Sequence, residues 1–283
     1  MTLTPIQMLL LGLAAFCYAA GGVGAAMQLA GKQVRISFRM SCIAAGLALS
    51  LLLLAWHARA TGNWQPLQDN FSALLTLAVL LAGFAAYFQI HRPMASLVAL
   101  CMPVVVVLLV MAGYFGRSQP GAYLITWYSL GHRVAAFLGI LAFVVAGASG
   151  VLYLLSDHML RLRWSGRQGK LRTPPSPEVF GSLERLERLT FASVVLGFAL
   201  FTLGILIGIG WVLHYHSTRM GAHWYLTPKV LLSFAAWIIF AIVLHTPIAP
   251  RLRGRKTAIL SICGLVLSLA TLLAVLLMPK GGQ

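Results

Sequence analysis

The residues best suited to chemistry in this chain are the histidines and aromatics gathered between Trp211 and His245. Three histidines lie in one short stretch and a fourth follows an apolar run of helical length; they are His214, His216, His223 and His245. Imidazole nitrogens are common ligands for iron, and flat aromatic rings can stack on a flat ligand. The segment therefore predicts a site for a planar, iron-bearing ligand.

The composition of the chain places this segment in a membrane protein. Of 283 residues, 60% are hydrophobic and only 9% are charged, and the mean hydropathy is +0.88. No soluble domain of this size buries such a fraction, so lipid must be the solvent for most of the chain. The net charge of +16 comes from cations in short loops, which indicate topology and contact with anionic lipid rather than nucleic acid.

Eight apolar runs are each long enough to cross about 30 Å of hydrocarbon. They lie near residues 5–29, 37–57, 71–90, 94–112, 128–156, 189–213, 228–246 and 257–278. We expect an all-α, polytopic bundle of about eight spans that forms one integral membrane domain over residues 1–283. The first run lacks a basic leader and is too long for a cleaved signal peptide, so it reads as a retained span. Residues 157–187 are expected to form a basic cytoplasmic linker.

The basic residues predict how the spans are oriented. Alternate connections hold fifteen of the 21 lysines and arginines, and the remaining connections hold six. Because cytoplasmic loops carry the excess of positive charge, the richer side should be cytoplasmic. In a bacterial inner membrane, both termini and the histidine-rich loop then lie on the outer face.

This topology sorts the histidines into two layers. Binding haem through two histidines requires imidazoles on opposite sides of one iron, usually from different helices. The outer layer offers His132 and one of the three histidines between Trp211 and Trp224, and the inner layer offers His91 and His245. The alternative for each is an interfacial histidine at a helix end, and the residues alone do not choose among the three loop histidines.

Cations and aromatics beside these histidines fit the same ligand. Arg133 and Lys229 could neutralise the haem propionates, and Trp224 could stack on the ring. Ordinary interfacial charges and an aromatic belt explain the same residues without a ligand. The chain has no CxxCH motif, so any haem would be b-type and non-covalent. It also lacks an obvious catalytic acid–base pair, so we do not expect an enzyme.

Three stretches together resemble the CcsA-type cytochrome c assembly proteins, in their shorter HemX-like branch. They are TWYSLGHRVAAFLGILAFVVAGASGVLYLL, GSLERLERLTFASVVLGFALFTLGILIGIGW and HWYLTPKVLLSFAAWIIFAIVLH. The resemblance covers residues 127–270, which it implies are a haem-handling core. In that family His132 corresponds to an external haem ligand, and His245 corresponds to the intramembrane histidine that ends the signature helix.

The third stretch matches the family signature only in part. Trp224, Pro228, Lys229 and Trp237 match it, whereas Thr227 and Val230 replace its acidic residues. No histidine follows His245, so one of the loop histidines would have to replace the family's second external ligand. These differences imply a small haem-handling relative rather than a full cytochrome c synthetase.

Three functions remain open, of which the resemblance implies the first two. The first is an inner-membrane protein that binds or presents haem to other cytochrome c assembly proteins or to an apocytochrome. The second is a HemX-like regulatory subunit for haem biosynthesis or for another membrane protein, acting through the basic cytoplasmic face. The third is a small-solute transporter, which the lack of acidic residues inside the spans disfavours.

Overall fold

The computed structural model describes residues 4–62, 64, 67, 69–91, 94–116, 127–164, 182–215, 224–246, 248–249 and 253–277. Within these residues the regular structure is entirely helical, which confirms the predicted all-α fold. The chain divides into two compact units. Unit 1 comprises Met1–Ala122 and His158–Ser182, and unit 2 comprises Tyr123–Asp157 and Leu183–Gln283.

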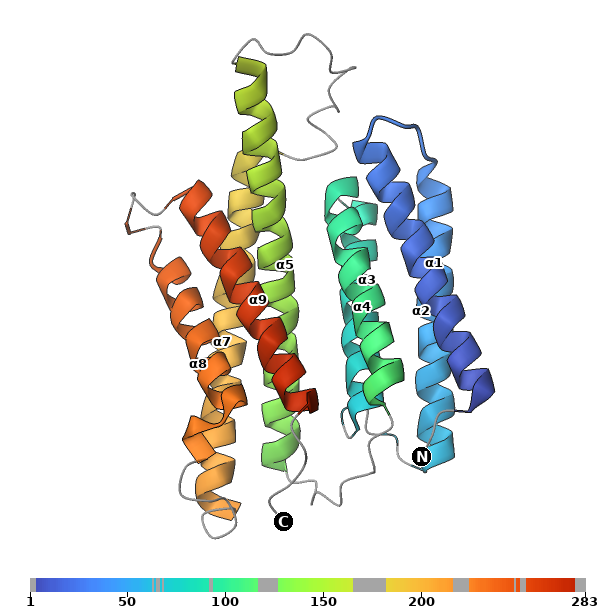
Figure 1. The fold of residues 1–283 in the computed structure, drawn as a ribbon, viewed down its shortest axis with the longest axis vertical. Coiled ribbons are helices and arrows are strands. Elements are labelled where there is room, and N and C mark those ends of the chain that lie inside the picture. Colours follow the sequence, from blue (N-terminus) through green and yellow to red (C-terminus); the bar gives the residue numbers. More distant parts are fainter. Residues whose placement is uncertain are drawn as a thin grey trace. The chain divides into compact units, whose positions relative to one another are not determined.

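Unit 1 contains four long helices that run alternately in opposite directions (Figure 1). They are α1 (Pro5–Leu29), α2 (Ile36–Thr61), α3 (Asn70–His91) and α4 (Ala95–Phe115). Helix α1 packs on α2 and α4, and α3 packs on the same two helices. The α1–α2 and α3–α4 connections therefore lie at one end of this unit.

Local sequence signals set the ends of these helices. Thr4 and Gln7 form a reciprocal capping box at the start of α1, with Pro5 in the first turn, where its missing N–H costs nothing. Gly62 ends α2 in the left-handed conformation, with φ of 66°, which glycine adopts without strain. Helix α3 ends at His91 and α4 begins at Ala95, so the predicted break between the third and fourth runs is confirmed.

Glycines let the helices of unit 1 approach closely. A Cβ atom at Gly46 of α2 would lie 2.8 Å from the ring of Tyr18 in α1, and a Cβ at Gly22 would lie equally close to Met102 of α4. Tyr18 is fully buried, and its hydroxyl lies 3.3 Å from that of Ser50. In lipid, where apolar burial adds little, such close packing stabilises helix pairs.

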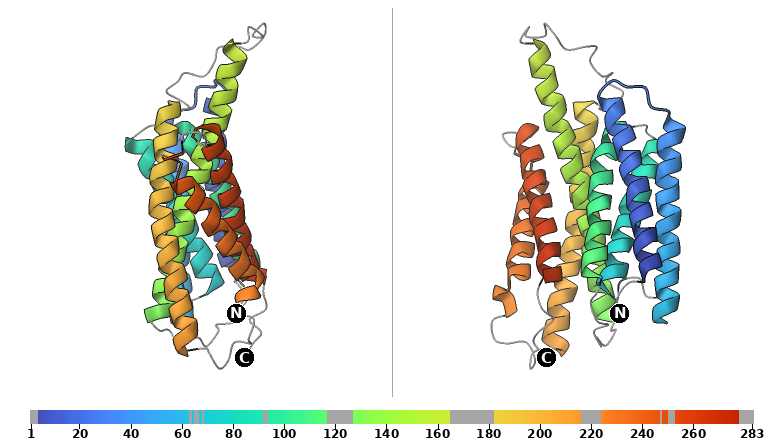
Figure 2. Two further views of the ribbon diagram at one scale, coloured as in Figure 1. Left: turned by 90° about the vertical axis from the view of Figure 1, so that its left-hand side faces the viewer. Right: turned by 45° about the vertical axis from the view of Figure 1, so that its right-hand side comes forward.

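Unit 2 contains four further long helices and a single 3₁₀ turn, which Figure 2 shows from two sides. They are α5 (Trp127–Trp164, of which residues up to Asp157 belong to this unit), α7 (Leu183–Tyr215), η1 (Trp224–Leu226), α8 (Pro228–Leu244) and α9 (Arg255–Leu277). Helix α8 packs on α9 and α7. Glycines of α5 face α7 and α9, since a Cβ at Gly139 would meet Phe201 and one at Gly150 would meet the backbone of Ala258.

Phe143 of α5 joins three helices of unit 2 in its core. Its ring stacks on that of Phe240 in α8 with centroids 3.6 Å apart, and it meets the edge of Phe201 in α7 at 5.5 Å. Phe143 and Phe240 are fully buried. Aromatic pairs of this kind contribute about 0.5–1.5 kcal/mol beyond the area they bury. The contacts hold α5, α7 and α8 in fixed register.

Seven of the described helices are long and apolar enough to cross a membrane. Helix α8, with 17 residues, is slightly shorter. Each predicted apolar run is thus a helix, and the polytopic membrane fold is confirmed. The predicted linker differs at both of its ends, because α5 continues to Trp164 and α7 already begins at Leu183. Leucine, arginine and glutamate favour helix there even beyond the apolar region.

Candidate functional site

His132 lies in the second turn of α5 and is fixed by a hydrogen bond to α7. Its Nδ1 lies 2.7 Å from the carbonyl oxygen of Gly204. A carbonyl only accepts, so Nδ1 carries the hydrogen and the neutral ring keeps its lone pair on Nε2. Histidines that bind metals are commonly oriented in this way, with the second nitrogen donating to a backbone carbonyl. The arrangement therefore suits His132 to ligate a metal through Nε2.

Two glycines of α7 make room for this imidazole. A Cβ atom at Gly208 would lie 2.8 Å from Nδ1 of His132, and a Cβ at Gly204 would lie 3.1 Å from the backbone nitrogen of Ala136. The two glycines are four residues apart and share one face of α7. The sequence analysis did not assign them to the site, although their spacing in TLGILIGIG is the signal that could have found them.

The structure also brings predicted cations to His132. Arg133 follows it on α5, and Lys229 lies in the first turn of α8. Both positive charges act electrostatically on the imidazole of His132. The start of α5, the end of α7 and the start of α8 therefore meet at one end of unit 2 (Figure 1). Positive charge beside a potential metal ligand suits a ligand that carries carboxylates.

Of the three predicted loop histidines, the structure describes His214. It lies in the last turn of α7, and its ring centroid is 6.4 Å from that of Tyr128, tilted by 30°. Tyr128 precedes His132 by one helical turn, so His214 lies at the same end of unit 2. His216 and His223 fall outside the described residues. Trp224 begins η1, but the structure describes only its backbone and not its side chain.

His245 caps α8 at the opposite end of unit 2. Its Nδ1 lies 2.7 Å from the carbonyl oxygen of Ala241, which again leaves Nε2 with the lone pair. Since α8 has 17 residues, about 25 Å of helix separates His245 from the Lys229 end. His245 and His132 therefore cannot ligate the same iron.

His91 belongs to unit 1, where it ends α3. Its Nδ1 lies 3.1 Å from the carbonyl oxygen of Tyr87, and its ring stacks on that of Tyr87 with centroids 4.3 Å apart. The predicted pairing of His91 with His245 would join residues of the two units and stays a prediction. Like His132 and His245, His91 donates a hydrogen bond from Nδ1 to a backbone carbonyl oxygen, which leaves Nε2 for another partner.

Trp237, which matches the family signature, has a structural contact in unit 2. Its Nε1 donates a hydrogen bond to Oγ1 of Thr202 at 2.9 Å, and its ring packs against Phe234 and Phe198. The bond links α8 to α7 at the residue that follows Phe201, one turn after Phe198. Trp237 thus holds the helix that carries Lys229 against the helix that carries Gly204.

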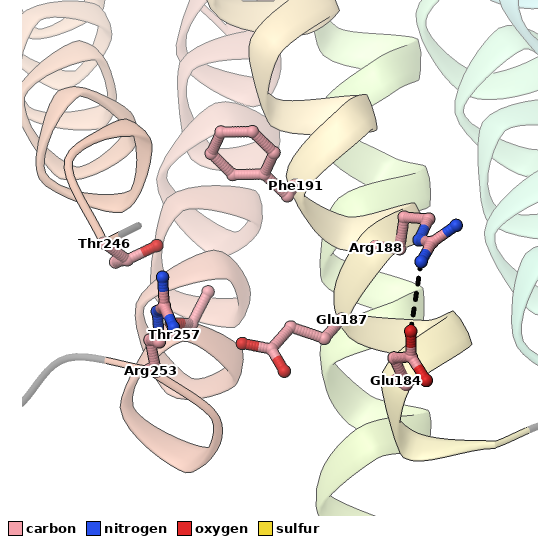
Figure 3. Close-up of a pocket in the computed structure, with 7 residues that line it drawn as sticks. All are labelled: Glu184, Glu187, Arg188, Phe191, Thr246, Arg253 and Thr257. Carbon is pink, nitrogen blue, oxygen red and sulfur yellow. Dashed lines mark hydrogen bonds and ion pairs between the residues drawn. The ribbon is translucent and has the colours of Figure 1, made fainter. Parts of the chain in front are cut away.

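An open pocket of about 210 Å³ lies at the His245 end of unit 2. Its lining residues come from the start of α7, the end of α8 and the start of α9 and are Glu184, Glu187, Arg188, Phe191, Thr246, Arg253 and Thr257. Figure 3 shows the 3.0 Å ion pair between Arg188 and Glu184, and Glu187 directed toward α9. The sequence analysis assigned none of these residues to a site.

A second polar pair that the sequence analysis missed lies in unit 1. Nε2 of His57 on α2 is 2.5 Å from Oδ2 of Asp69, and the other carboxylate oxygen accepts the backbone N–H of Ser72 at 2.6 Å. Burial alone would raise the pKa of Asp69, but the hydrogen bonds from His57 and Ser72 outweigh it and lower that pKa. In the sequence, Asp69 precedes Ser72 by three residues at the start of α3, and this N-cap spacing could have indicated the role of Asp69.

The described residues contain no group of three or more histidine, cysteine or acidic side chains that could hold a metal ion. A haem iron needs only one or two protein ligands. The donor set at the His132 end consists of an oriented imidazole, two cations and nearby aromatic rings. It fits haem better than a bare cation.

Comparison with known proteins identifies the family of the chain. The model of the family described as "Cytochrome C assembly protein" matches residues 13–282. The chain is similar to proteins named "Cytochrome c biogenesis protein CcsA": 34% identical over 106 residues in Microcystis aeruginosa, 33% over 108 in Nostoc punctiforme and 34% over 96 in Mesostigma viride. These alignments cover 38%, 38% and 34% of this chain.

The same alignments cover 31%, 30% and 30% of those relatives, so the matched part is about a third of their length. No solved structure matches the chain. The family model extends over nearly the whole sequence, and the helices are those of a multi-pass membrane protein. The chain belongs to the cytochrome c assembly protein family.

Proposed function

We propose that this protein binds haem non-covalently at the His132 end of unit 2 and presents it to a partner during cytochrome c assembly. The hydrogen bond from Nδ1 of His132 to Gly204 carries the proposal, because it sets the tautomer and orientation that an iron ligand needs. The CcsA relatives, named for cytochrome c biogenesis, support the same role.

His132 would hold the haem iron through Nε2, and His214 is the described candidate for a second ligand. His216 and His223 remain alternatives, as the sequence analysis left them. Arg133 and Lys229 would pair with the two propionates, since both already lie near His132. When bound, haem would supply an iron centre for imidazole ligands of the chain. The protein's own task is to orient imidazole and neutralise the carboxylates.

Haem binding is tested by titrating haemin into detergent-purified protein and following the Soret band. His132→Ala should lower haem affinity by about tenfold or more, as loss of an axial ligand requires. His158→Ala is the matched control, because His158 is an exposed histidine near the far end of the same helix. Wild-type protein that takes up no haemin, or a His132→Ala variant that binds like wild type, would contradict the proposal.

We further propose that His245 and His91 serve an inner layer of haem handling. The His245→Ala and His91→Ala variants should then change the spectrum of bound haem without abolishing the signal that depends on His132. The His132 end would face the outside of a bacterial inner membrane, where an apocytochrome or another assembly protein could receive the haem. Cross-linking from the His132 end to a co-expressed apocytochrome tests that partner.

A second candidate function is regulatory, as the HemX-like branch implies. The observation in its favour is that α5 continues beyond its apolar part to Trp164 and carries exposed Arg161. Such a helical extension offers a contact surface for a cytoplasmic partner. Affinity capture should recover a soluble partner that is lost when Arg161, Arg163 and Arg167 are neutralised. Recovery of the same proteins by the neutralised variant would rule this function out.

A further inference from the structure

Arg39 in the first turns of α2 is a charged residue buried inside unit 1. Its side chain is 2% exposed, and within the described chain its Nε and Nη1 have no hydrogen-bond partner. A buried charge without a partner costs several kcal/mol, so a stable fold normally supplies a counterion. We therefore expect an anion to bind beside the guanidinium group of Arg39.

Unit 1 does not provide that anion from its own described residues. Asp69 is the single carboxylate among them, and it precedes α3 at the end of the unit opposite Arg39. Asp69 is also already engaged by His57 and Ser72. The counterion of Arg39 must therefore come from outside this unit's described side chains.

Other buried polar atoms without partners lie at the same end of unit 1. They are Oε1 of Gln28 at the end of α1, Oε1 of Gln89 at the end of α3 and Oγ of Ser96 at the start of α4. Gln89 is 2% exposed and Ser96 is fully buried. One end of the four helices thus combines hydrogen-bond donors on Arg39 with acceptors on the two glutamines.

The backbone at this end also favours an anion. The first turns of α2 and α4 both lie here, and neither has a side-chain cap for its free N–H groups. Helix N-termini attract negative charge. Gly24 of α1 leaves room for the side chain of Arg39, because a Cβ atom at this position would lie only 3.0 Å from Cγ of Arg39.

We propose that this end of unit 1 binds the phosphate of a glycerophosphate group, such as the headgroup of phosphatidylglycerol. The guanidinium fork suits phosphate oxygens, and the orphan oxygens of Gln28 and Gln89 suit the headgroup hydroxyls. Arg39 lies about 4.5 Å along the axis from the start of α2, a depth next to the lipid phosphates. Exposed Lys32 and Arg35 at the same end would attract anionic lipid.

The test begins with extensively delipidated, detergent-purified wild-type protein. Phosphate analysis and mass spectrometry of the extract should find about one retained anionic phospholipid per chain, as expected for one buried guanidinium. Added short-chain phosphatidylglycerol should raise the melting temperature more than short-chain phosphatidylcholine does. Free glycerol phosphate, added in a parallel arm, shows whether the headgroup alone suffices. Protein with no retained phospholipid and no stabilisation by phosphatidylglycerol or glycerol phosphate would overturn the proposal.

Variants then assign the binding to Arg39. Arg39→Gln should weaken phosphatidylglycerol binding about tenfold or more, as loss of a charged hydrogen-bond donor implies. Arg39→Lys keeps the positive charge but lacks the planar set of guanidinium donors, so it should bind phosphatidylglycerol with intermediate affinity. Arg59→Gln removes an exposed charge at the opposite end of α2 and should stay within about twofold of wild type. Equal phosphatidylglycerol binding by Arg39→Gln and wild type would overturn the assignment. If Arg39→Gln does not fold, the lipid analysis of the wild-type protein still tests the proposal.

Discussion

His132 shows how one residue's chemistry depends on its neighbours across a helix interface. The imidazole donates from Nδ1 to Gly204 and fits beside Gly208 only because that residue lacks a side chain. Lys229 and Arg133 add positive charge nearby. The proposed ligand, its orienting carbonyl and the proposed counter-charges thus come from three helices of unit 2, so on the proposed function a change in any of them should alter haem affinity.

Gly208→Ala tests that arrangement without removing the ligand. The added Cβ would lie 2.8 Å from Nδ1 of His132, so the ring must move and its bond to Gly204 must weaken. Haem affinity should fall about 10- to 100-fold, the usual effect of losing such an orienting contact. Gly210→Ala is the control, because a Cβ there meets no atom within 4 Å. Haemin titration of the two variants gives the comparison, and equal affinities would contradict the assigned orientation.

Asp69 should make the stability of unit 1 sensitive to acid. Its pKa is lowered in the folded protein, so the ionised form stabilises the fold above the unfolded pKa of about 3.9. That stabilisation should disappear as the pH falls below about 5 and through the lower folded pKa. Asp69→Asn keeps an acceptor for the N–H of Ser72 but removes the charge. Thermal unfolding at pH 7 and pH 4 should show a smaller pH effect in the variant than in wild type.

At the scale of the elements, small residues decide which helices pack together. Gly139, Gly204 and Gly208 join α5 to α7, while Gly147 and Gly150 join α5 to α9. Because lipid tails are as apolar as the side chains they replace, close backbone packing supplies much of the association energy. The stacked pair of Phe143 and Phe240 then fixes the register.

Gly150→Ala should destabilise unit 2 by about 1–3 kcal/mol, the usual cost of overpacking. A Cβ at this position would lie 2.9 Å from the carbonyl oxygen of Ala258, and backbone atoms cannot rotate away. Gly210→Ala, which meets open space, should be neutral or stabilising by up to about 1 kcal/mol. Thermal unfolding in detergent measures both changes. A Gly150→Ala variant as stable as wild type would show that α5 and α9 are not in close contact.

At the scale of the whole molecule, the chain is a multi-pass membrane protein of the cytochrome c assembly family. Within unit 1 the basic α1–α2 connection lies at the end of the buried Arg39, and within unit 2 the basic starts of α7 and α9 lie at the His245 end. The positive-inside rule assigns both of these ends to the cytoplasm. The His132 end would then face outward.

Reporter fusions test this orientation in cells. A fluorescent protein fused after Gly31, between α1 and α2, should be fluorescent because the rule assigns that connection to the cytoplasm. Alkaline phosphatase fused after Gly62, at the end of α2, should be active because it requires the outer compartment. Reversed activities at the two positions would invert the topology and place His132 on the cytoplasmic side.

Much of the fold could be predicted from the sequence because lipid imposes a simple length rule. Each apolar run became a helix, and the break at His91, Arg92 and Pro93 separated α3 from α4 as expected. Helix α5 continues beyond the predicted apolar run to Trp164. Hydropathy reports where the apolar region ends, whereas helix propensity and packing decide where the helix ends.

The sequence by itself determined the membrane class, the helices and the histidines worth considering, because composition and apolar length are local properties. Only the tertiary structure decided that Gly204 orients His132, that Lys229 joins it, and that His245 lies at the other end of α8. It also paired His57 with Asp69 and, within the described residues, left Nε and Nη1 of the buried Arg39 without a hydrogen-bond partner. Such contacts join segments that are far apart along the chain, so the sequence does not specify which of their faces meet.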